Sequence, residues 1–103
     1  MSYNTPEGKI KKKVTQLLKS YSVWYFMPVS NGFGKAGIPD YIACVSGTFI
    51  GVECKSDTKK NPTALQVKCG EGIKEAGGHW LVVCDDESLA ELKKLLEVAQ
   101  GIH

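Results

Sequence analysis

Three charged side chains in the middle of the chain could do chemistry together. Asp40 begins one β-rich run, and Glu53 and Lys55 lie at the end of the next. Two neighbouring carboxylates repel each other, so holding them together is costly unless a cation neutralises them. Mg²⁺ and similar hard ions prefer oxygen ligands and keep several waters, so two carboxylates and the backbone carbonyl of Cys54 would be sufficient protein ligands. With a lysine to orient water or offset charge on a phosphate, these parts suit phosphodiester hydrolysis.

The convergence of these side chains depends on the register of a β-hairpin. Ser46-Gly47 between the two β-rich runs predicts a connection of two or four residues. In the register that pairs the residues on either side of Ser46-Gly47, Asp40 lies directly opposite Glu53, and Lys55 lies on the same face. A three-residue loop would shift the register by one residue and place Asp40 across from Cys54 instead.

An ordinary structural role is the alternative for each of these residues. Asp40 follows Pro39 and could simply begin a strand as a turn residue, while Glu53 and Lys55 could be a surface pair on an edge strand. Taken singly, each of these explanations is the commoner one. A surface strand, however, has no reason to place two acids opposite each other, so both interpretations stay open on the residues alone.

The first helix is predicted to begin at Pro6. Thr5 is a suitable N-cap, Pro6 suits the first helical position, and Glu7 lies near the positive end of the helix dipole. An apolar stripe follows at helical spacing: Ile10, Val14, Leu17, Leu18 and Tyr21. Glu7 projects onto the same stripe. It is therefore either a solvent-reaching partner of the dipole or a carboxylate aimed into a cleft.

The remaining segments predict two more strands and two more helices. The strands are expected at Val23–Val29 and at His79–Cys84, whose continuous apolar character suits an interior strand. The helices are expected to begin at Asn61-Pro62, as N-cap and first residue, and at Asp85 or Asp86. Their apolar stripes are Leu65, Cys69, Gly72, Ile73 and Ala76 in the first, and Leu89, Leu92, Leu95, Leu96 and Ala99 in the second. The predicted order is αβββαβα.

Two further features lie near the expected site. Gln66 is at the margin of its helix stripe, where it could reach a cleft, although an exposed helical glutamine is the commoner explanation. The segment 30–37 is glycine-rich but is not a nucleotide-binding P-loop, because Lys35 is followed by Ala36, so that the hydroxyl such loops offer to magnesium is missing. We expect a surface loop close to the site.

Charge is unevenly distributed along the chain. The 103 residues include 13 Lys, no Arg and 11 acidic residues, with a net charge of +2. Residues 1–69 carry a net charge of +6, and residues 70–103 carry one of −4. A basic face that meets phosphates and an acidic face turned away from them would explain this asymmetry, and so would solvated helix surfaces.

The composition predicts one folded domain over residues 1–103. Apolar residues make up 43% of the chain and charged residues 23%. No apolar run approaches the roughly 18 residues of a membrane-spanning helix, and no signal peptide is evident, so we expect a cytoplasmic protein. The spacing of the cysteines argues against zinc and predicts reduced, buried thiols at all four: Cys44, Cys54, Cys69 and Cys84.

A resemblance to a known family emerges from the motifs together. Ile38-Pro39-Asp40, followed thirteen residues later by Glu53-Cys54-Lys55, resembles the PD-(D/E)XK nuclease motif. Gly37 before it, and Pro62-Thr63-Ala64-Leu65-Gln66 after it, resemble the VRR-NUC family in the small standalone form found in phages. The resemblance extends from the first helix to the last strand. It implies a restriction-endonuclease-like α/β core with a central mixed sheet flanked by helices, and for a phage-encoded member it places the protein in the host cytoplasm.

The resemblance also implies a role for each residue of the expected site. Asp40 and Glu53 would be ligands of Mg²⁺ or Mn²⁺ together with the Cys54 carbonyl, and Lys55 would be the catalytic lysine. Two other residues would complete the catalytic set: Glu7, as the acidic residue of the first helix that approaches the metal through water, and Gln66, as a glutamine that holds water or substrate beside the site. No nucleotide cofactor is implied.

The implied activity is metal-dependent, structure-selective cleavage of DNA. Standalone members of the family resemble nucleases of branched DNA, including resolvases of four-way (Holliday) junctions. One protomer has one active site, so symmetric cleavage implies a homodimer. Its interface would lie on the leucines of the last helix, if these are not core, or on the apolar residues of Val23–Val29.

A second interpretation is a non-catalytic module that binds branched DNA or a partner nuclease. Binding would then depend steeply on salt and would involve no metal-dependent turnover. Seven lysines would contact phosphates in this case: Lys9, Lys11, Lys12, Lys13, Lys19, Lys59 and Lys60.

Overall fold

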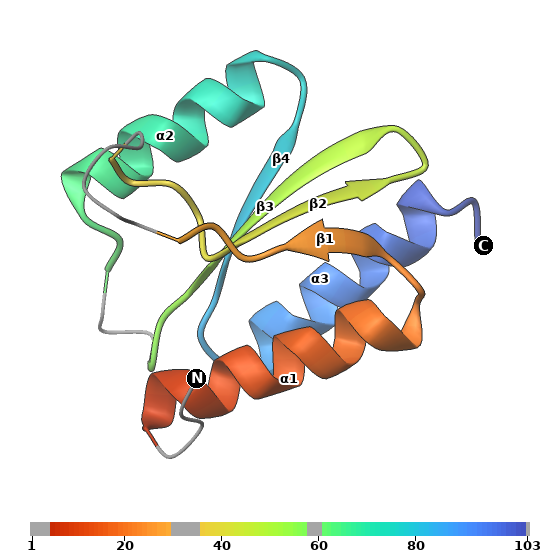
Figure 1. Cartoon of the computed structure of the whole chain (residues 1–103), viewed down its shortest axis with the longest axis horizontal. Coiled ribbons are helices and arrows are strands. Elements are labelled where there is room, and N and C mark those ends of the chain that lie inside the picture. The colour runs from red at the N-terminus through yellow and green to blue at the C-terminus, as the bar shows by residue number, and fades with distance from the viewer. Residues whose placement is uncertain (1–4, 30–35, 58–60, 103) are drawn as a thin grey trace.

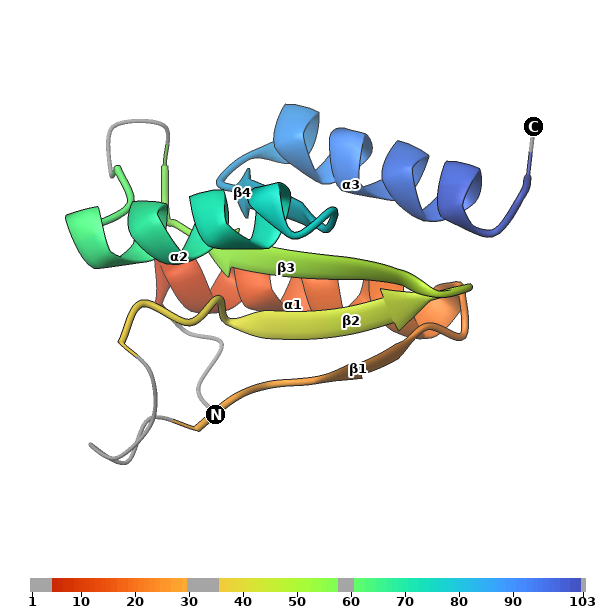
Figure 2. The same cartoon turned by 90° about the horizontal axis from the view of Figure 1, so that it is seen from above.

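Four strands form one mixed sheet that lies between helices in the computed structural model, which describes residues 5–29, 36–57 and 61–102 (Figure 1). One helix covers one face of the sheet, and two helices lie side by side on the other face (Figures 1 and 2). In chain order the elements are α1 (Pro6–Ser20), β1 (Trp24–Phe26), β2 (Tyr41–Val45), β3 (Thr48–Cys54), α2 (Ala64–Glu75), β4 (His79–Val83) and α3 (Asp86–Ala99). The predicted αβββαβα order is confirmed.

The sheet has the strand order β1-β2-β3-β4. Strands β1, β2 and β3 are antiparallel neighbours, whereas β4 runs parallel to β3. Parallel neighbours need a crossover connection, and α2 supplies it. The crossover carries the chain over the sheet face that α1 and α3 leave free.

A two-residue turn fixes the register of the β2–β3 hairpin. Ser46 and Gly47 both have positive φ angles, 50° and 84°, as a type I′ turn requires. Val45 therefore pairs with Thr48, and the ladder continues to the pair Tyr41 and Val52. This is the register that the sequence predicts for the convergence of the charged residues.

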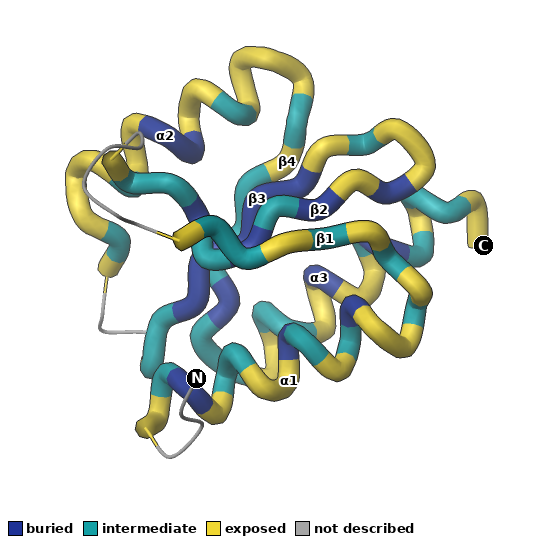
Figure 3. The backbone as a smooth tube through the Cα atoms, in the orientation of Figure 1, coloured by how far each residue is buried: buried dark blue, intermediate teal, exposed yellow. Residues whose placement is uncertain are grey.

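The hydrophobic core lies between the sheet and the α1/α3 layer, where buried residues gather in Figure 3. Its fully enclosed members come from the strands and from both helices: Val14, Leu18, Tyr41, Ala43, Ile50, Val52, Cys54, Val83, Leu92 and Leu96. The leucines at 92 and 96 are thus core residues rather than part of an interface. The Tyr41 hydroxyl donates a hydrogen bond of 2.8 Å to the Lys11 carbonyl oxygen, which fastens α1 to the first residue of β2.

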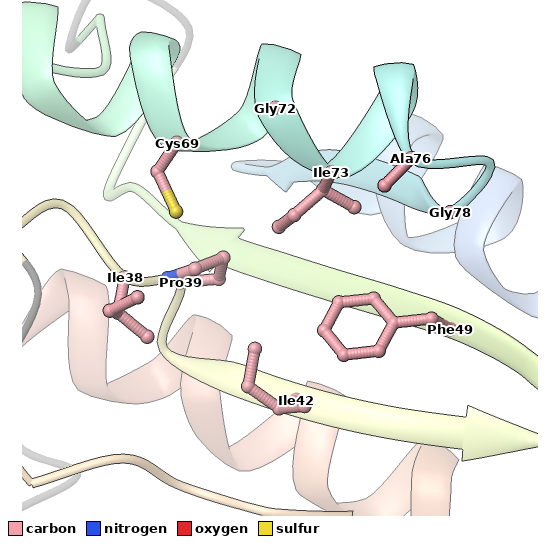
Figure 4. Close-up of a pocket in the computed structure, with 9 residues that line it drawn as sticks. All are labelled: Ile38, Pro39, Ile42, Phe49, Cys69, Gly72, Ile73, Ala76 and Gly78. Atoms are coloured by element: carbon pink, nitrogen blue, oxygen red, sulfur yellow. The ribbon is translucent and has the colours of Figure 1, made fainter.

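The opposite face of the sheet is only partly covered by α2. The Trp80 ring packs so closely on α2 that a Cβ atom at Gly70 would lie 2.1 Å from it. Towards β2 the contact opens into a groove of about 460 Å³ (Figure 4). Its lining is largely apolar and includes Ile38, Pro39, Ile42, Phe49, Cys69 and Ile73.

Two predicted element boundaries are wrong. The strand expected at Val23–Val29 is limited to Trp24–Phe26, because Pro28 has no N–H to donate to a ladder. The second helix begins at Ala64 rather than at Pro62, and its N-cap is Thr63 rather than Asn61. The Thr63 hydroxyl and the Gln66 side chain satisfy each other's backbone N–H groups, an arrangement that Asn61 does not offer to this helix.

Three predictions of burial are also wrong. Strand β4 is not interior, since it is last in the order of the described strands; its apolar side chains are covered by the helices on the two faces of the sheet. Cys44 is exposed, because it lies on the part of the sheet that α2 does not reach; Cys84 is only half-buried, and all four thiols are free. In α2 only Cys69 of the predicted stripe is buried, since α2 covers only part of this face.

Two sequence features fall partly outside the described residues. Residues 30–35 of the glycine-rich segment do so, as do Lys59 and Lys60. Within the described part of the chain, no helix combines the length and hydropathy that crossing a membrane requires.

Candidate active site

Asp40 and Glu53 face each other at the end of the hairpin where β2 begins and β3 ends. The ladder ends at the pair Tyr41 and Val52, and continuing its register by one residue places Asp40 opposite Glu53. The Asp40 carboxylate oxygen Oδ2 accepts a hydrogen bond of 2.7 Å from the backbone N–H of Cys54. This contact ties Asp40 to the end of β3 and orients its carboxylate.

Glu53 is the buried member of the pair, with 3% of its surface exposed. One oxygen, Oε1, accepts a hydrogen bond of 3.1 Å from the Gln66 side-chain amide. No hydrogen-bond donor of the described residues reaches the other oxygen, Oε2, although it is shielded from solvent. A buried carboxylate oxygen without a donor is energetically costly, so Oε2 is the atom of this site that most needs a cation or a proton.

The pKa of Glu53 reflects this environment. Burial is the main cause that raises it to about 8, and a hydrogen bond with the Asp40 carboxyl and repulsion from its charge add to the effect. The positive charge of Lys55 acts in the opposite direction. Without a metal, the Glu53 carboxyl is therefore largely protonated at neutral pH.

Gln66 connects the first turn of α2 to the carboxylate pair. Its side-chain oxygen accepts a hydrogen bond of 2.8 Å from the Thr63 backbone N–H, which completes the capping box. Its side-chain NH₂ group is thereby aimed at Glu53. The side chain that completes the capping box therefore also contacts the buried carboxylate.

Gly37 allows the segment before Asp40 to approach α2 closely. It has a φ of +79°, and a Cβ atom there would lie 2.3 Å from the Leu65 carbonyl oxygen. Only glycine fits such an approach without strain. The buried Pro39 then leads the chain into β2. Asp40 and Gln66 are in this way brought to the same end of the β2–β3 hairpin.

Lys11, which the predicted site did not include, enters the site from α1. Its ammonium Nζ lies 3.6 Å from Asp40 Oδ1 and 3.5 Å from Glu7 Oε2. Burial alone would lower the pKa of Lys11, but the charges of Asp40 and Glu7 outweigh it and raise the pKa. The spacing of four residues from Glu7 was the signal available in the sequence. It predicts the pairing with Glu7 but not the contact with Asp40.

Glu7 lies beside the carboxylate pair rather than within it. Its side chain is 45% exposed, and its link to Asp40 runs through Lys11. Among residues 5–29, 36–57 and 61–102, no three His, Cys, Asp or Glu side chains come together as metal ligands. The predicted approach of Glu7 to a metal through water stays a prediction.

Lys55 follows the last residue of β3 and is half-buried. Its backbone N–H donates a hydrogen bond of 3.0 Å to the Val83 carbonyl, which extends the pairing of β3 with β4 past the strand end. The positive charge of Lys55 acts on Glu53 and favours its ionised form. Lys55 takes part in none of the ion pairs within the described ranges, so its charge is available to a ligand.

Cys54 contributes its backbone rather than its thiol. The side chain belongs to the core, and burial together with the charge of Asp40 raises the pKa of the thiol well above its ordinary value. In an extended strand the N–H and C=O of one residue point to the same side. Because the Cys54 N–H reaches Asp40, the Cys54 carbonyl also points towards the Asp40 side.

These groups fit a hard divalent cation. Two carboxylates and a carbonyl offer only oxygen atoms, and Mg²⁺ commonly takes one or two carboxylates while keeping water ligands. The unpartnered Glu53 Oε2 supplies the specific observation, since a cation there would remove the cost of its burial. The thiols do not form an alternative site within the described residues.

The order and pairing of the elements define an α/β core in which a mixed four-stranded sheet lies between helices. A solved structure described as a VRR_NUC domain is similar to this chain with a TM-score of 0.76. The match covers 87% of this chain and 96% of that chain, at 22% sequence identity. The amino-acid sequence matches no family model and no curated protein. The similarity confirms the fold that the sequence motifs imply.

Proposed function

We propose that the protein is a divalent-metal-dependent deoxyribonuclease that hydrolyses phosphodiester bonds. The observation that carries this proposal is the pairing of Asp40 with the buried Glu53, whose Oε2 atom has no donor, beside the available ammonium of Lys55. Similarity to the structure described as a VRR_NUC domain supports the same conclusion from the fold.

In this proposal each residue has one task. Asp40 and Glu53 hold Mg²⁺ or Mn²⁺ with the Cys54 carbonyl, and the ion supplies charge stabilisation and activation of water when it is bound. Lys55 orients the attacking water and offsets the charge that develops on the phosphate. Gln66 keeps Glu53 in its ligating orientation through its 3.1 Å hydrogen bond.

A DNA substrate agrees with the position of the positive charge. Residues 1–69, which contain all the proposed metal ligands, carry ten Lys and four acidic residues. Lys9 and Lys12 are exposed on the same helix as Lys11. A divalent ion at Asp40 and Glu53 would cancel the charge of two of the four acids and make this surface more attractive to phosphates.

Branched DNA such as four-way junctions is the proposed substrate class, and a homodimer is the proposed assembly. Symmetric cleavage needs two sites related by a twofold axis.

A surface suited to the interface lies on the α2 side of the sheet, and we call it the aromatic face. Its residues share one side of β1, β2 and β3: Trp24, Phe26, Ile42, Cys44 and Phe49.

The aromatic face is too apolar to be an ordinary solvent-exposed strand surface. Trp24 is 64% exposed and Phe26 is 47% exposed, and their rings contact each other edge to face. The face continues into the groove between α2 and the sheet, because Ile42 and Phe49 belong to both (Figure 4). A second copy related by a twofold axis would cover the aromatic face and the groove at once, since each protomer would offer the same aromatic residues and the same groove.

The deciding experiment incubates the purified protein with linear duplex, nicked duplex, flap and four-way junction DNA. Each substrate is tested with Mg²⁺, with Mn²⁺ and with a chelator, and products are resolved on denaturing gels. We expect cleavage of branched substrates only when a divalent ion is present. Salt-dependent binding without cleavage under any of these conditions would overturn the proposed function and favour the non-catalytic binding module.

A further inference from the structure

The four oxygen atoms of the carboxylate pair are not equally available. Asp40 Oδ2 accepts a hydrogen bond from the Cys54 backbone, and Glu53 Oε1 accepts one from Gln66. Glu53 Oε2 has no donor, while Asp40 Oδ1 lies 3.6 Å from the Lys11 ammonium. Glu53 Oε2 and Asp40 Oδ1 are therefore the oxygens of the pair that hydrogen-bond donors occupy least, and Lys11 already neutralises the charge at Asp40 Oδ1.

Lys11 is held at this position by its backbone as well as by its charge. The Tyr41 hydroxyl donates to the Lys11 carbonyl and shares a hydrogen bond of 2.7 Å with the Thr15 hydroxyl. Tyr41 is fully buried and directly follows Asp40 in the chain. The turn of α1 that bears Lys11 is therefore fastened to the strand that bears Asp40, and only the lysine side chain is left to move.

The side chain has a second partner to which it can turn. Glu7 Oε2 lies 3.5 Å from the ammonium, one helical turn earlier on α1. The Lys11 side chain is 21% exposed, so it is partly shielded from solvent but not enclosed. An ammonium displaced from Asp40 can thus keep its contact with Glu7 without leaving the edge of the site.

We propose that Lys11 is the resident counter-ion of the metal-free carboxylate pair and that a divalent cation must displace it from Asp40. This inference rests on the proposed metal-dependent function and adds a control on metal affinity to it. Lys11 is a positioning residue: it holds Asp40 in place before the metal arrives and competes with the metal for the same carboxylate. The competition lowers affinity, because the ammonium both occupies the site and repels the incoming cation.

The test measures Mn²⁺ binding by titration calorimetry for the wild-type protein and three variants. Lys11→Met removes the charge but keeps an apolar stem of similar length, and Lys11→Arg keeps the charge. Lys13→Met is the matched control, because Lys13 lies on the same helix and its ion pair with Asp86 is on the surface. We expect Lys11→Met to bind Mn²⁺ at least about tenfold more tightly than wild type, whereas Lys11→Arg and Lys13→Met should stay within about twofold.

A second readout separates competition from loss of fold. Without metal, Lys11→Met should unfold at a lower temperature than Lys13→Met, because Asp40 loses its counter-ion. Saturating Mn²⁺ should then raise its unfolding temperature by more than it raises that of wild type. Equal Mn²⁺ affinities in all four proteins would overturn the inference about Lys11 and leave the proposed nuclease standing. Tighter binding by Lys11→Met in a protein that cleaves no DNA would support the inference and overturn the proposed function.

Discussion

The Gln66 side-chain nitrogen lies 3.1 Å from Glu53 Oε1, and this hydrogen bond joins the first turn of α2 to the end of β3. Gln66 makes the contact while its carbonyl oxygen caps the helix at Thr63. One side chain therefore serves both the stability of α2 and the geometry of the carboxylate pair. The two roles can be separated by substitution.

Replacement of Gln66 by alanine should lower the cleavage rate by about 10- to 100-fold, because Glu53 loses the donor that fixes its orientation. The matched control is Thr63→Ala, which removes the hydroxyl of the cap but leaves the amide of Gln66 in place. It should cost about 1 kcal/mol of stability with little loss of activity. Equal losses of activity in the two variants would show that Gln66 acts only through the helix cap.

Replacement of Lys55 by alanine should reduce metal-dependent cleavage by roughly 10²–10³-fold, because the charge on the phosphate loses its partner in the transition state. Asp40→Asn should also abolish cleavage, through loss of a metal ligand. Both variants should keep the circular dichroism spectrum of wild type and should still bind DNA in gel-shift assays. Normal turnover by either variant would contradict the proposed roles.

The metal-free protein should lose stability as the pH rises from about 5 to above 8. The folded state holds a proton on Glu53 up to a pKa of about 8, whereas unfolded glutamate releases it near 4.5. In that interval the folded state binds more protons than the unfolded state, so the free energy of unfolding falls with increasing pH. Urea denaturation in a chelator, compared between wild type and Glu53→Gln, measures the effect. A difference between them that does not change with pH would count against a buried proton at Glu53.

Gly37→Ala should destabilise the protein more than Gly47→Ala. Both residues have positive φ, which costs alanine about 1–2 kcal/mol. A Cβ atom at Gly37 would also collide with the Leu65 backbone, for a further ~1–3 kcal/mol, whereas a Cβ at Gly47 meets nothing within 4 Å. Chemical denaturation measures the difference. Cleavage should fall only in Gly37→Ala, because only that loop positions Asp40 against Gln66.

Trp24→Glu should convert the proposed homodimer into a monomer, because it places a charge on the aromatic face. Light scattering coupled to size exclusion at micromolar concentration measures the mass. Val98→Glu is the matched control, since Val98 is 58% exposed on α3, on the other side of the sheet. A wild-type protein that is monomeric yet cuts four-way junctions symmetrically would contradict the proposed assembly.

Local chemistry made the hairpin and the helix caps predictable from the sequence. The pair Ser46-Gly47 restricts the turn so strongly that the register, and with it the opposition of Asp40 and Glu53, follows from two residues. The Pro6 and Asp85 ends of helices were equally recognisable. The start of α2 was misplaced because two capping signals lie close together, and the reciprocal bonds of Thr63 and Gln66 decide between them.

Contacts between segments that are distant in the sequence were harder to predict. Lys11 looked like one of several surface lysines, because nothing in its neighbours reveals that Tyr41 holds its carbonyl and brings it to Asp40. Cys44 looked like a core thiol for a similar reason, since its exposure depends on how far α2 extends over the sheet. Periodicity shows which residues share a face but not which part of that face another element covers.

The turn at Ser46 and Gly47 makes the site tolerant of some mutations and intolerant of others. Its residues lie at the end of the hairpin far from Asp40, and most substitutions there would change stability without touching the carboxylates. An insertion or deletion of one residue would be different, because it would shift the register by one. Asp40 would then lie across from a residue whose side chain points to the other face of the sheet. Variation at this turn is therefore expected in residue type and not in length.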